Sequence, residues 1–451
     1  MISLSRRRPL ARPLARRSVR PLARLLAVTV VIAGSQLPIS PAAASAAPPG
    51  DIQADQASRA VAVSQDGRYA YFHSSAKNLA PGLATGSHLY RRDLRDRVTE
   101  LVDVSHVGSA PSAGLSGSTF ASADGRWLVF LSRAGNLVPI DRNGIDDIFI
   151  RDMDQQTTEL VSVATDGTQA NAWSSPAGVS DDGRFVVFQS NATNLIAGGT
   201  PQGVRHIYVR DRLLGTTEVV TEVPATSIAP AWSPMVSADG RSIAYDLYLP
   251  GPGGVPVWTS IVHDLTTGTT EVASVATDGT TANAESNVAA FGGDGDFVLL
   301  RSDGSNLVYH DTNGYSDVFV RNLKRGITKI ASLAHDGSLA DGPCRALDIS
   351  NNGRYVVFGS AAANLMPGDT NGVLDVFVRD RQGAGVTDLV SVAADGGPAN
   401  GPSDSAAISA PGRLVLFTSS ATNLVDGDTN GFPDVFLRNL ATGTTIRVSV
   451  A

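Results

Sequence analysis

Short stretches of apolar residues, each four to seven long and separated by polar turns, recur through the chain from residue 57 to its end. Residues 354–392 show the pattern well, with strand-like runs at 354–358, 375–379 and 386–392, and the next run at 405–408. These runs are rich in β-branched and aromatic residues and are bounded by Gly, Asn, Asp or Pro, which is typical of β-strands. No helical periodicity follows the first 46 residues. The pattern predicts an all-β fold.

One turn motif sets the period of these strands. Ser-x-Asp-Gly-Arg occurs at 64–68, 122–126, 180–184 and 237–241, and weaker copies follow. The glycines of the seven copies are 55 to 59 residues apart: Gly67, Gly125, Gly183, Gly240, Gly295, Gly353 and Gly412. Four strands per copy and seven copies predict a seven-bladed β-propeller of four-stranded antiparallel blades over residues 57–451. Two β-sandwiches, the alternative, would not explain one repeat that stays in phase throughout.

The same repeat predicts two details of the ring. Asp-Gly between the first and second strands suits a two-residue hairpin, because glycine accepts a positive φ. The first copy begins with its own first strand and the last ends on its fourth. We therefore expect the ring to close without strand exchange, and the contact between blades one and seven to be its weakest.

The repeat resembles a known family. Ser-x-Asp-Gly-Arg before an apolar strand, Asp-Val-Phe-Val-Arg-Asp at 375–380 and Thr-Gly-Thr-Thr at 442–445 are similar to the TolB-type (WD-like) propeller repeat of exported bacterial proteins. The resemblance covers nearly all of residues 57–451 and implies the fold. It implies no single function, because relatives include binding scaffolds, lyases and domains of peptidases. The chain differs from TolB itself, which has six blades and a separate N-terminal domain.

The first 46 residues have the composition of a secretion signal. Eight Arg and no acidic residue accompany an apolar run at 25–33, and small residues follow at 42–46. The apolar run is about ten residues long, whereas about 20 are needed to cross a bilayer. We predict a signal peptide at 1–46, a short linker at 47–56, and a secreted protein that does not insert in a membrane.

Charge and cysteine content narrow the expected partners. The chain has 36 Lys+Arg against 43 Asp+Glu, and without residues 1–46 it keeps 28 basic residues, for a net charge of −15. Such a surface repels nucleic acid. The single Cys344 cannot form an internal disulfide. We expect a monomer that binds a protein or carbohydrate ligand and no nucleic acid.

Long loops rich in Asp, Asn, Gly and Ser join the second to the third strands and one blade to the next. Because strands alternate in direction, these loops share one face, where we expect function, at or near the central channel. Four of them carry Asp-x-Asn-Gly-x-x-Asp, which supplies the oxygen ligands that Ca²⁺ prefers. The candidate metal ligands are Asp141, Asn143 and Asp147; Asp311, Asn313 and Asp317; Asp369, Asn371 and Asp375; and Asp426, Asp428, Asn430 and Asp434.

The Asp426 loop is the first candidate for Ca²⁺, because its longer motif is similar to the calcium loops of integrin-type propellers. Pro139, Tyr309 and Pro367 replace that first aspartate in the other three copies. In the alternative interpretation, Asp and Asn cap turns and hold no metal.

Blades three and four lack this motif and carry most of the tryptophan. Trp173, Trp232 and Trp258, with Tyr309 in blade five, are candidates for an aromatic platform that binds a sugar ring or a peptide side chain. Burial of these rings between blades is the alternative.

Catalytic motifs are missing from the sequence: there is no His-Glu-x-x-His, no Cys-His zinc spacing and no Gly-x-Ser-x-Gly. We therefore expect a non-catalytic binding or scaffold protein and assign no catalytic residue. The alternative is a carbohydrate-active lyase or hydrolase near blades three to five, for which the candidates are Arg205, His206, His310 and Asp311. A recurring third-strand arginine, such as Arg151 or Arg379, is expected to bond a recurring aspartate.

Overall fold

The computed structural model describes residues 51–451, with gaps at 84, 222–230, 252–253, 294 and 384. The chain divides into two units, Met1–Ser40 and Pro41–Ala451. All described residues belong to the second unit. The predicted signal peptide at 1–46 and the first part of the linker lie outside the described residues.

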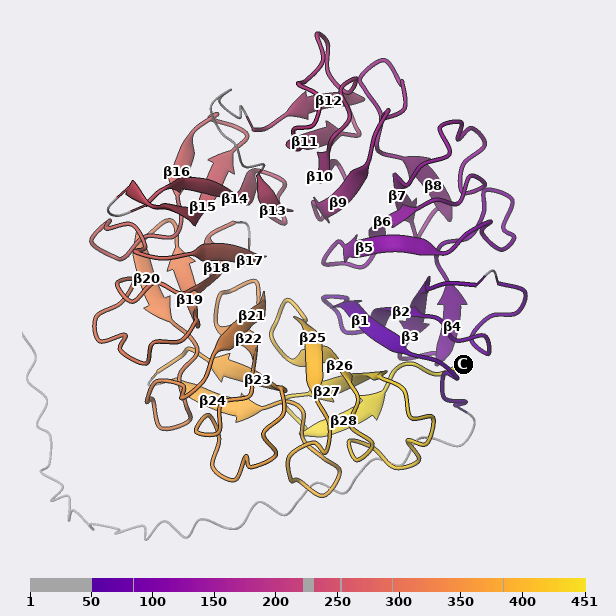
Figure 1. Ribbon diagram of the computed structural model, residues 1–451. Helices are drawn as coiled ribbons and strands as arrows, with labels where there is room; N and C mark the ends of the chain where they lie inside the picture. Colours follow the sequence, from indigo (N-terminus) through magenta and orange to yellow (C-terminus); the bar gives the residue numbers. More distant parts are fainter. Residues whose placement is uncertain (1–50, 84, 222–230, 252–253, 294, 384) are drawn as a thin grey trace, which may run out of the picture. The chain divides into compact units, whose positions relative to one another are not determined.

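Seven antiparallel sheets of four strands each make up the second unit, and within the described residues every regular element is a strand. In each sheet the strands follow sequence order, and the first strands β1, β5, β9, β13, β17, β21 and β25 surround the centre of the ring (Figure 1). Among the described strands, none is exchanged between blades one and seven. The predicted seven-bladed propeller is confirmed.

The strand boundaries of the seven blades are as follows. Blades one and two contain β1 (Ser58–Val63), β2 (Tyr69–Ser74), β3 (His88–Asp93), β4 (Val98–Leu101), β5 (Leu115–Ala121), β6 (Trp127–Ser132), β7 (Asp147–Asp152) and β8 (Thr157–Leu160). Blades three and four contain β9 (Ser174–Val179), β10 (Phe185–Ser190), β11 (His206–Asp211), β12 (Thr216–Val219), β13 (Trp232–Val236), β14 (Ser242–Pro250), β15 (Pro256–Asp264) and β16 (Thr270–Val272). Blade five contains β17 (Ser286–Gly292), β18 (Phe297–Ser302), β19 (Asp317–Asn322) and β20 (Ile327–Ile330). Blades six and seven contain β21 (Cys344–Ile349), β22 (Tyr355–Ser360), β23 (Asp375–Asp380), β24 (Val386–Leu389), β25 (Ser403–Ile408), β26 (Leu414–Ser419), β27 (Asp434–Asn439) and β28 (Thr444–Arg447).

Apolar contact between neighbouring blades holds the ring together. The described residues form seven hydrophobic clusters, one at each blade interface, including the interface between blades seven and one. The second and third strands are buried on both faces, so they read as nearly continuous apolar runs, such as 356–358 and 376–378. Fully buried rings such as Phe358 and Phe377 each contribute roughly 1.5–3 kcal/mol by leaving water.

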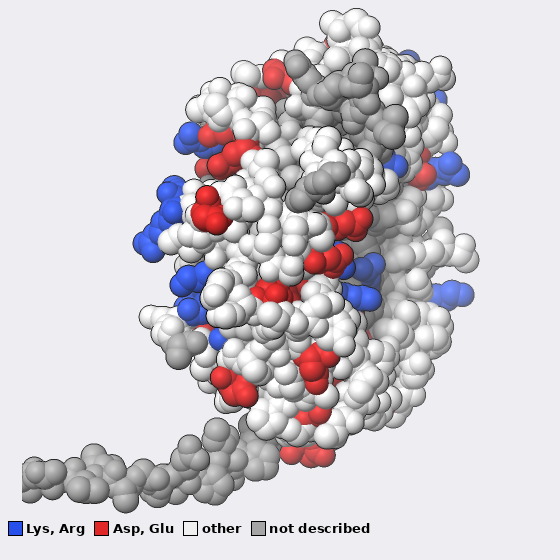
Figure 2. Space-filling model, turned by 60° about the vertical axis from the view of Figure 1, so that its left-hand side comes forward, with Lys and Arg blue, Asp and Glu red and all other residues white. Residues whose placement is uncertain are grey.

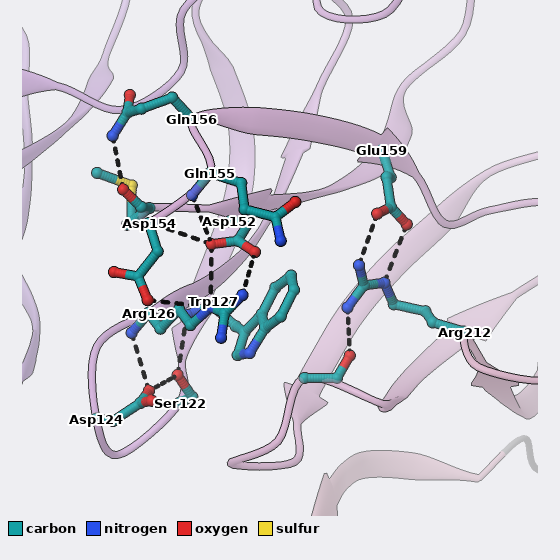
Figure 3. Close-up of polar contacts among 12 residues, drawn as sticks. Ser122, Asp124, Arg126, Trp127, Asp152, Asp154, Gln155, Gln156, Glu159 and Arg212 are labelled. Atoms are coloured by element: carbon teal, nitrogen blue, oxygen red, sulfur yellow. Dashed lines mark hydrogen bonds and ion pairs between the residues drawn. The ribbon is translucent and has the colours of Figure 1, made fainter.

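The turn between the first and second strands is longer than predicted. In blade two, β5 ends at Ala121 and β6 begins at Trp127, so five residues intervene where a two-residue hairpin was expected. The Ser122 hydroxyl donates to Asp124 (2.6 Å) and accepts from the backbone N–H of Trp127 (2.9 Å), so the serine side chain fixes the wider turn (Figure 3). Gly125 keeps the positive φ that the motif predicted, at 74°.

The hairpin glycines also allow neighbouring blades to approach closely. Trp127 of blade two lies against Gly183 of blade three, and a Cβ at Gly183 would overlap the indole ring. The guanidinium groups of Arg126 and Arg212 cover the indole at 4.7 and 4.3 Å from its centroid. Glu159 of blade two binds Arg212 of blade three at 2.7 Å (Figure 3). The turn motif therefore joins blades as well as strands.

Residues 51–55, half of the predicted linker, connect the last blade to the first. The Ala54 N–H donates to the Ser449 carbonyl (3.0 Å), as the Ala170 N–H does to the Ser162 carbonyl (2.9 Å) between blades two and three. Between blades two and three this bond lies within one continuous stretch of chain. Between blades seven and one the same bond joins the two ends of the propeller.

The expected bond to an aspartate is wrong for the two third-strand arginines named above, Arg151 and Arg379. Arg151 donates to Thr158 (3.1 Å) and Arg379 donates to Thr387 (2.9 Å), each threonine lying on the neighbouring fourth strand. Arg379 also reaches the Ala334 carbonyl of the preceding blade (3.1 Å). Burial lowers the pKa of both arginines, because the charged guanidinium loses its solvation by water.

Charged side chains of both signs are scattered over a largely uncharged surface on the side of blades four and five (Figure 2). A search of the described residues finds no helix with the length and apolar character that a membrane span requires.

Candidate functional site

The loop-bearing face gathers aromatic side chains from blades three and four. Trp173 lies in the connection before β9, Trp232 begins β13, and Trp258 lies on β15 opposite Tyr248 of β14. The β14–β15 hairpin is nine residues per strand, against six in most blades, and its extra length carries Tyr248 and Trp258. Three of the four predicted platform residues therefore come from adjacent elements.

These rings form one connected cluster around an arginine. The guanidinium of Arg205 lies 4.8 Å from the centroid of Trp173 and 4.2 Å from that of Trp232, within the range of cation–π contacts. Trp232 meets Trp258 edge to face at 6.5 Å, and Trp258 contacts Tyr248 at 5.3 Å. Trp173 and Trp232 remain 38% and 43% exposed, so the cluster opens to solvent.

Arg205 lacks a counter-charge among the described residues. Its only hydrogen bond there is a long one to the Gln189 amide oxygen (3.3 Å), and its Nε is buried with no partner. Burial lowers the pKa of its guanidinium. Both indole rings contact the guanidinium group. Its N–H groups point outward in the plane of the guanidinium, where a carboxylate could accept from them.

Tyr309 lies apart from the cluster. It is 89% exposed and contacts only its neighbour His310 among the described rings, at 3.9 Å. His310 has a positive φ of 68°, which turns the chain into the acidic loop that follows. The candidate His206, which follows Arg205, is buried, and neither of its ring nitrogens has a hydrogen-bond partner among the described residues. Burial lowers the pKa of its imidazole. Among the described residues, no hydrogen bond or ion pair joins the four residues suggested for catalysis.

The four Asp-x-Asn-Gly-x-x-Asp loops share one geometry. In blade five, the Asn313 amide oxygen accepts from the Tyr315 N–H (3.2 Å), and its nitrogen donates to Asp317 (2.8 Å) and to the Ala340 carbonyl (3.2 Å). Asn143, Asn371 and Asn430 make the same turn bond to the residue two positions on. The asparagines thus cap turns, as the alternative interpretation proposed, and their oxygens are already engaged.

The last aspartate of each loop begins the third strand and is fully buried. One of its oxygens accepts from a serine hydroxyl two residues beyond the end of the fourth strand; the pairs are Asp147–Ser162, Asp317–Ser332, Asp375–Ser391 and Asp434–Ser449. The first aspartate of the loop lies beside it. Asp426, the extra acid of the fourth loop, is exposed.

In two of these carboxylate pairs, one aspartate has a pKa above its ordinary value. Burial, and then the charge of Asp317, raise the pKa of Asp311 to about 6. Burial raises the pKa of Asp375 to about 6, to which the charge of Asp369 contributes. Within the described ranges no group of three or more His, Cys, Asp or Glu side chains is placed to hold a metal ion, so a cation here would need backbone or water oxygens as well.

The central channel has an apolar end. A cavity of about 350 Å³ lies between the first strands and the one–two turns, lined largely by small residues such as Ala62, Ala121, Ala177, Ala290 and Ala406. The one–two turns lie opposite the face that carries the tryptophans. The cavity is therefore separate from the aromatic cluster.

A buried aspartate of blade four predicts a pH effect on stability. Asp246 accepts from Ser260 (2.9 Å), the Val288 N–H (3.0 Å) and Asn287 (3.2 Å), and burial raises its pKa to about 7. The unfolded chain releases this proton near the ordinary value of 3.8, so the folded state loses relative stability as the pH rises from about 4 to about 7.

Urea unfolding of wild type and Asp246→Asn between pH 4 and 8 measures this effect. As the pH rises to 7, wild type should lose up to about 4 kcal/mol of unfolding free energy relative to Asp246→Asn. Above pH 7 the difference between the two proteins should stay constant. A difference that does not change with pH would show that Asp246 does not titrate in this range.

The sequence did not reveal three participants in these sites. Tyr248 was not recognised because the length of its hairpin is invisible until the strands pair. Gln53 and Arg447, which contact Asp428, lie outside the repeated motif. The sequence did offer one signal for Gln53. Gln169 of blade two holds the same position as Gln53, and each of these glutamines precedes an alanine.

The chain is a β-propeller, and its likeness to known proteins is one of fold. No protein-family model and no curated protein matches it. An oligogalacturonate lyase from Vibrio parahaemolyticus aligns with a TM-score of 0.51 at 11% identity, covering 86% of this chain and 91% of that one. The propeller domain of the trilobed protease from Pyrococcus furiosus, described as having an open velcro topology, aligns at 0.52 and 11% identity, covering 88% and 96%.

A prolyl endopeptidase aligns at 0.54 and 13% identity over 88% of this chain; the chain spans 50% of that enzyme. At these identities the alignments bear on the fold alone. The expected propeller fold is thereby confirmed. A relationship to exported TolB-type proteins stays a prediction.

Proposed function

We propose that the protein is an exported binding protein whose loop-bearing face recognises an acidic saccharide. The observation that carries the proposal is the half-exposed pair Trp173 and Trp232 clasping Arg205, a guanidinium with no carboxylate partner among the described residues. Indole faces offer apolar area to a sugar ring, and a guanidinium fork matches a carboxylate. The predicted signal peptide at 1–46 supports the export part of the proposal.

The acidic character of the ligand follows from Arg205. The net charge of the chain beyond residue 46 is −15, so a polyanion gains nothing from the surface as a whole. An anionic ligand must then be bound by a single positive side chain whose neighbours shield it from water. Arg205 between two indoles is such a group, and it favours a short acidic segment over a long polyanion.

Isothermal titration with oligogalacturonate, the saccharide named in the lyase neighbour, tests the proposal. Trp232→Ala should weaken binding about 30-fold or more, because it removes one wall of the cluster. Arg205→Lys should also weaken it, since lysine keeps the charge but lacks the planar fork. Trp127→Phe, which alters a tryptophan on the opposite face, is the matched control and should bind as wild type does.

Failure of the wild-type protein to bind any acidic saccharide would overturn the proposal, as would undiminished binding by Trp232→Ala. Binding of an acidic peptide in place of the saccharide would favour a protein ligand. Release of cleaved product during the titration would favour the enzyme alternative.

A further inference from the structure

Blade seven contains a pair of buried carboxylates bridged by an amide. The side-chain nitrogen of Gln53 donates to Asp428 (2.8 Å) and to Asp434 (2.7 Å), so it lies between the two carboxylates. Arg447 adds a positive charge 3.7 Å from Asp428. The two negative charges of this loop are therefore compensated by groups of the chain itself.

Blade five has the same carboxylates without either compensating group. Leu339 holds the position of Gln53, as its bridge to Leu333 shows, and Ile330 holds the position of Arg447 at the end of the fourth strand. Asp311 is only 9% exposed, and no described residue donates a hydrogen bond to its carboxylate or pairs with it. The charge that acts on it is that of Asp317, which is of the same sign.

Blade six has a similar arrangement, except that the backbone of Asn371 donates a hydrogen bond to Asp369. Pro398 holds the position of the bridging glutamine and Leu389 that of the arginine. Asp369 is 8% exposed and lies beside the fully buried Asp375. Two like charges in a buried site cost several kcal/mol each unless an opposite charge or a proton compensates them.

Blade two shows the intermediate case. Gln169 holds the position of Gln53, and its amide oxygen accepts from the Arg142 N–H (3.0 Å), as that of Gln53 accepts from the Thr429 N–H (3.3 Å). Its amide nitrogen is buried in the same region as unpartnered oxygens of Asp141 and Asp147. A glutamine amide is thus present at this position in blades two and seven, and among the four blades that carry the motif, blades five and six lack it.

We infer that blades five and six each bind a hard divalent cation between their paired aspartates, Asp311 with Asp317 and Asp369 with Asp375, at the place that the Gln53 amide takes in blade seven. Carboxylate oxygens are the preferred ligands of Ca²⁺, and backbone carbonyls and water complete six to eight oxygens. The inference does not depend on saccharide binding. It also changes the expected place of the cation, because the sequence favoured the Asp426 loop of blade seven as the first candidate for Ca²⁺.

Calcium titration of the chelator-treated full chain tests the inference by stoichiometry. Wild type should bind two Ca²⁺ ions, Asp311→Asn one, and Asp311→Asn/Asp369→Asn none. Leu339→Gln, which installs the amide of blade seven in blade five, should also bind one. Asp428→Asn is the matched control and should still bind two. No binding by wild type, or loss of binding in Asp428→Asn alone, would overturn the inference.

Thermal unfolding separates a cation site from a structural role of the carboxylate. With chelator, Asp311→Asn should melt at the wild-type temperature or above it, because the variant removes the repulsion from Asp317. With Ca²⁺, the order should reverse. A lower melting temperature under both conditions would mean that Asp311 supports the loop without a cation, and would overturn the inference for blade five.

Discussion

Gly183→Ala is expected to lower the free energy of unfolding by about 2–5 kcal/mol, the sum of a left-handed backbone strain and an overpacked contact. Gly183 has a φ of 70°, and an added Cβ would overlap the indole of Trp127. The ring cannot easily yield, because Arg126 and Arg212 cover its two sides. Chemical unfolding in urea measures the loss.

Gly167→Ala is the control for this prediction. Gly167 has a similar φ of 85°, but nothing lies within 4 Å of the position that a Cβ would take. Its substitution should therefore cost only the backbone term, about 1–2 kcal/mol. Equal losses in the two variants would show that the contact between Trp127 and Gly183 does not hold blades two and three together.

A chain that starts at Gln56 is expected to be several kcal/mol less stable than one that starts at Asp51. The shorter chain loses the Asp51 carboxylate, which binds the buried Arg92 at 2.8 Å, and loss of one partner of such a pair costs about 3–5 kcal/mol. It also loses the amide of Gln53 that separates Asp428 from Asp434. Both losses fall at the junction of blades one and seven.

Hydrogen exchange locates this effect. In the chain that starts at Gln56, protection should fall first in β1–β4 and β25–β28, while blades three to five keep theirs. A uniform fall in all blades would mean that the ring unfolds as one unit and that the junction is not its weakest contact. Unchanged stability would show that residues 51–55 contribute nothing to closure.

The sequence predicted the architecture well because one motif recurs with every blade. The Asp-Gly turn marks each repeat, and apolar runs such as 356–358 mark strands that neighbouring blades cover on both faces. The turn length was wrong for a local reason: the side chain of Ser122 bonds across the turn to Asp124 and to the Trp127 N–H, and so fixes a longer turn.

The sites were less predictable because they depend on contacts between distant residues. Gln53 meets Asp428 from 375 positions away, and Arg447 replaces an apolar residue in a single blade. Neither fact is visible in the Asp-x-Asn-Gly-x-x-Asp motif. By contrast, the grouping of Trp173, Trp232 and Trp258 followed from strand direction alone, because that direction assigns their loops to one face.

Intrinsic tryptophan fluorescence of Trp127→Phe tests binding at the loop-bearing face most directly, because the three tryptophans that remain all belong to the aromatic cluster. Titration with oligogalacturonate should change the emission in a saturable way, and a neutral oligosaccharide of the same length should not. Emission that stays constant with every acidic saccharide, while the protein remains folded, would contradict the account.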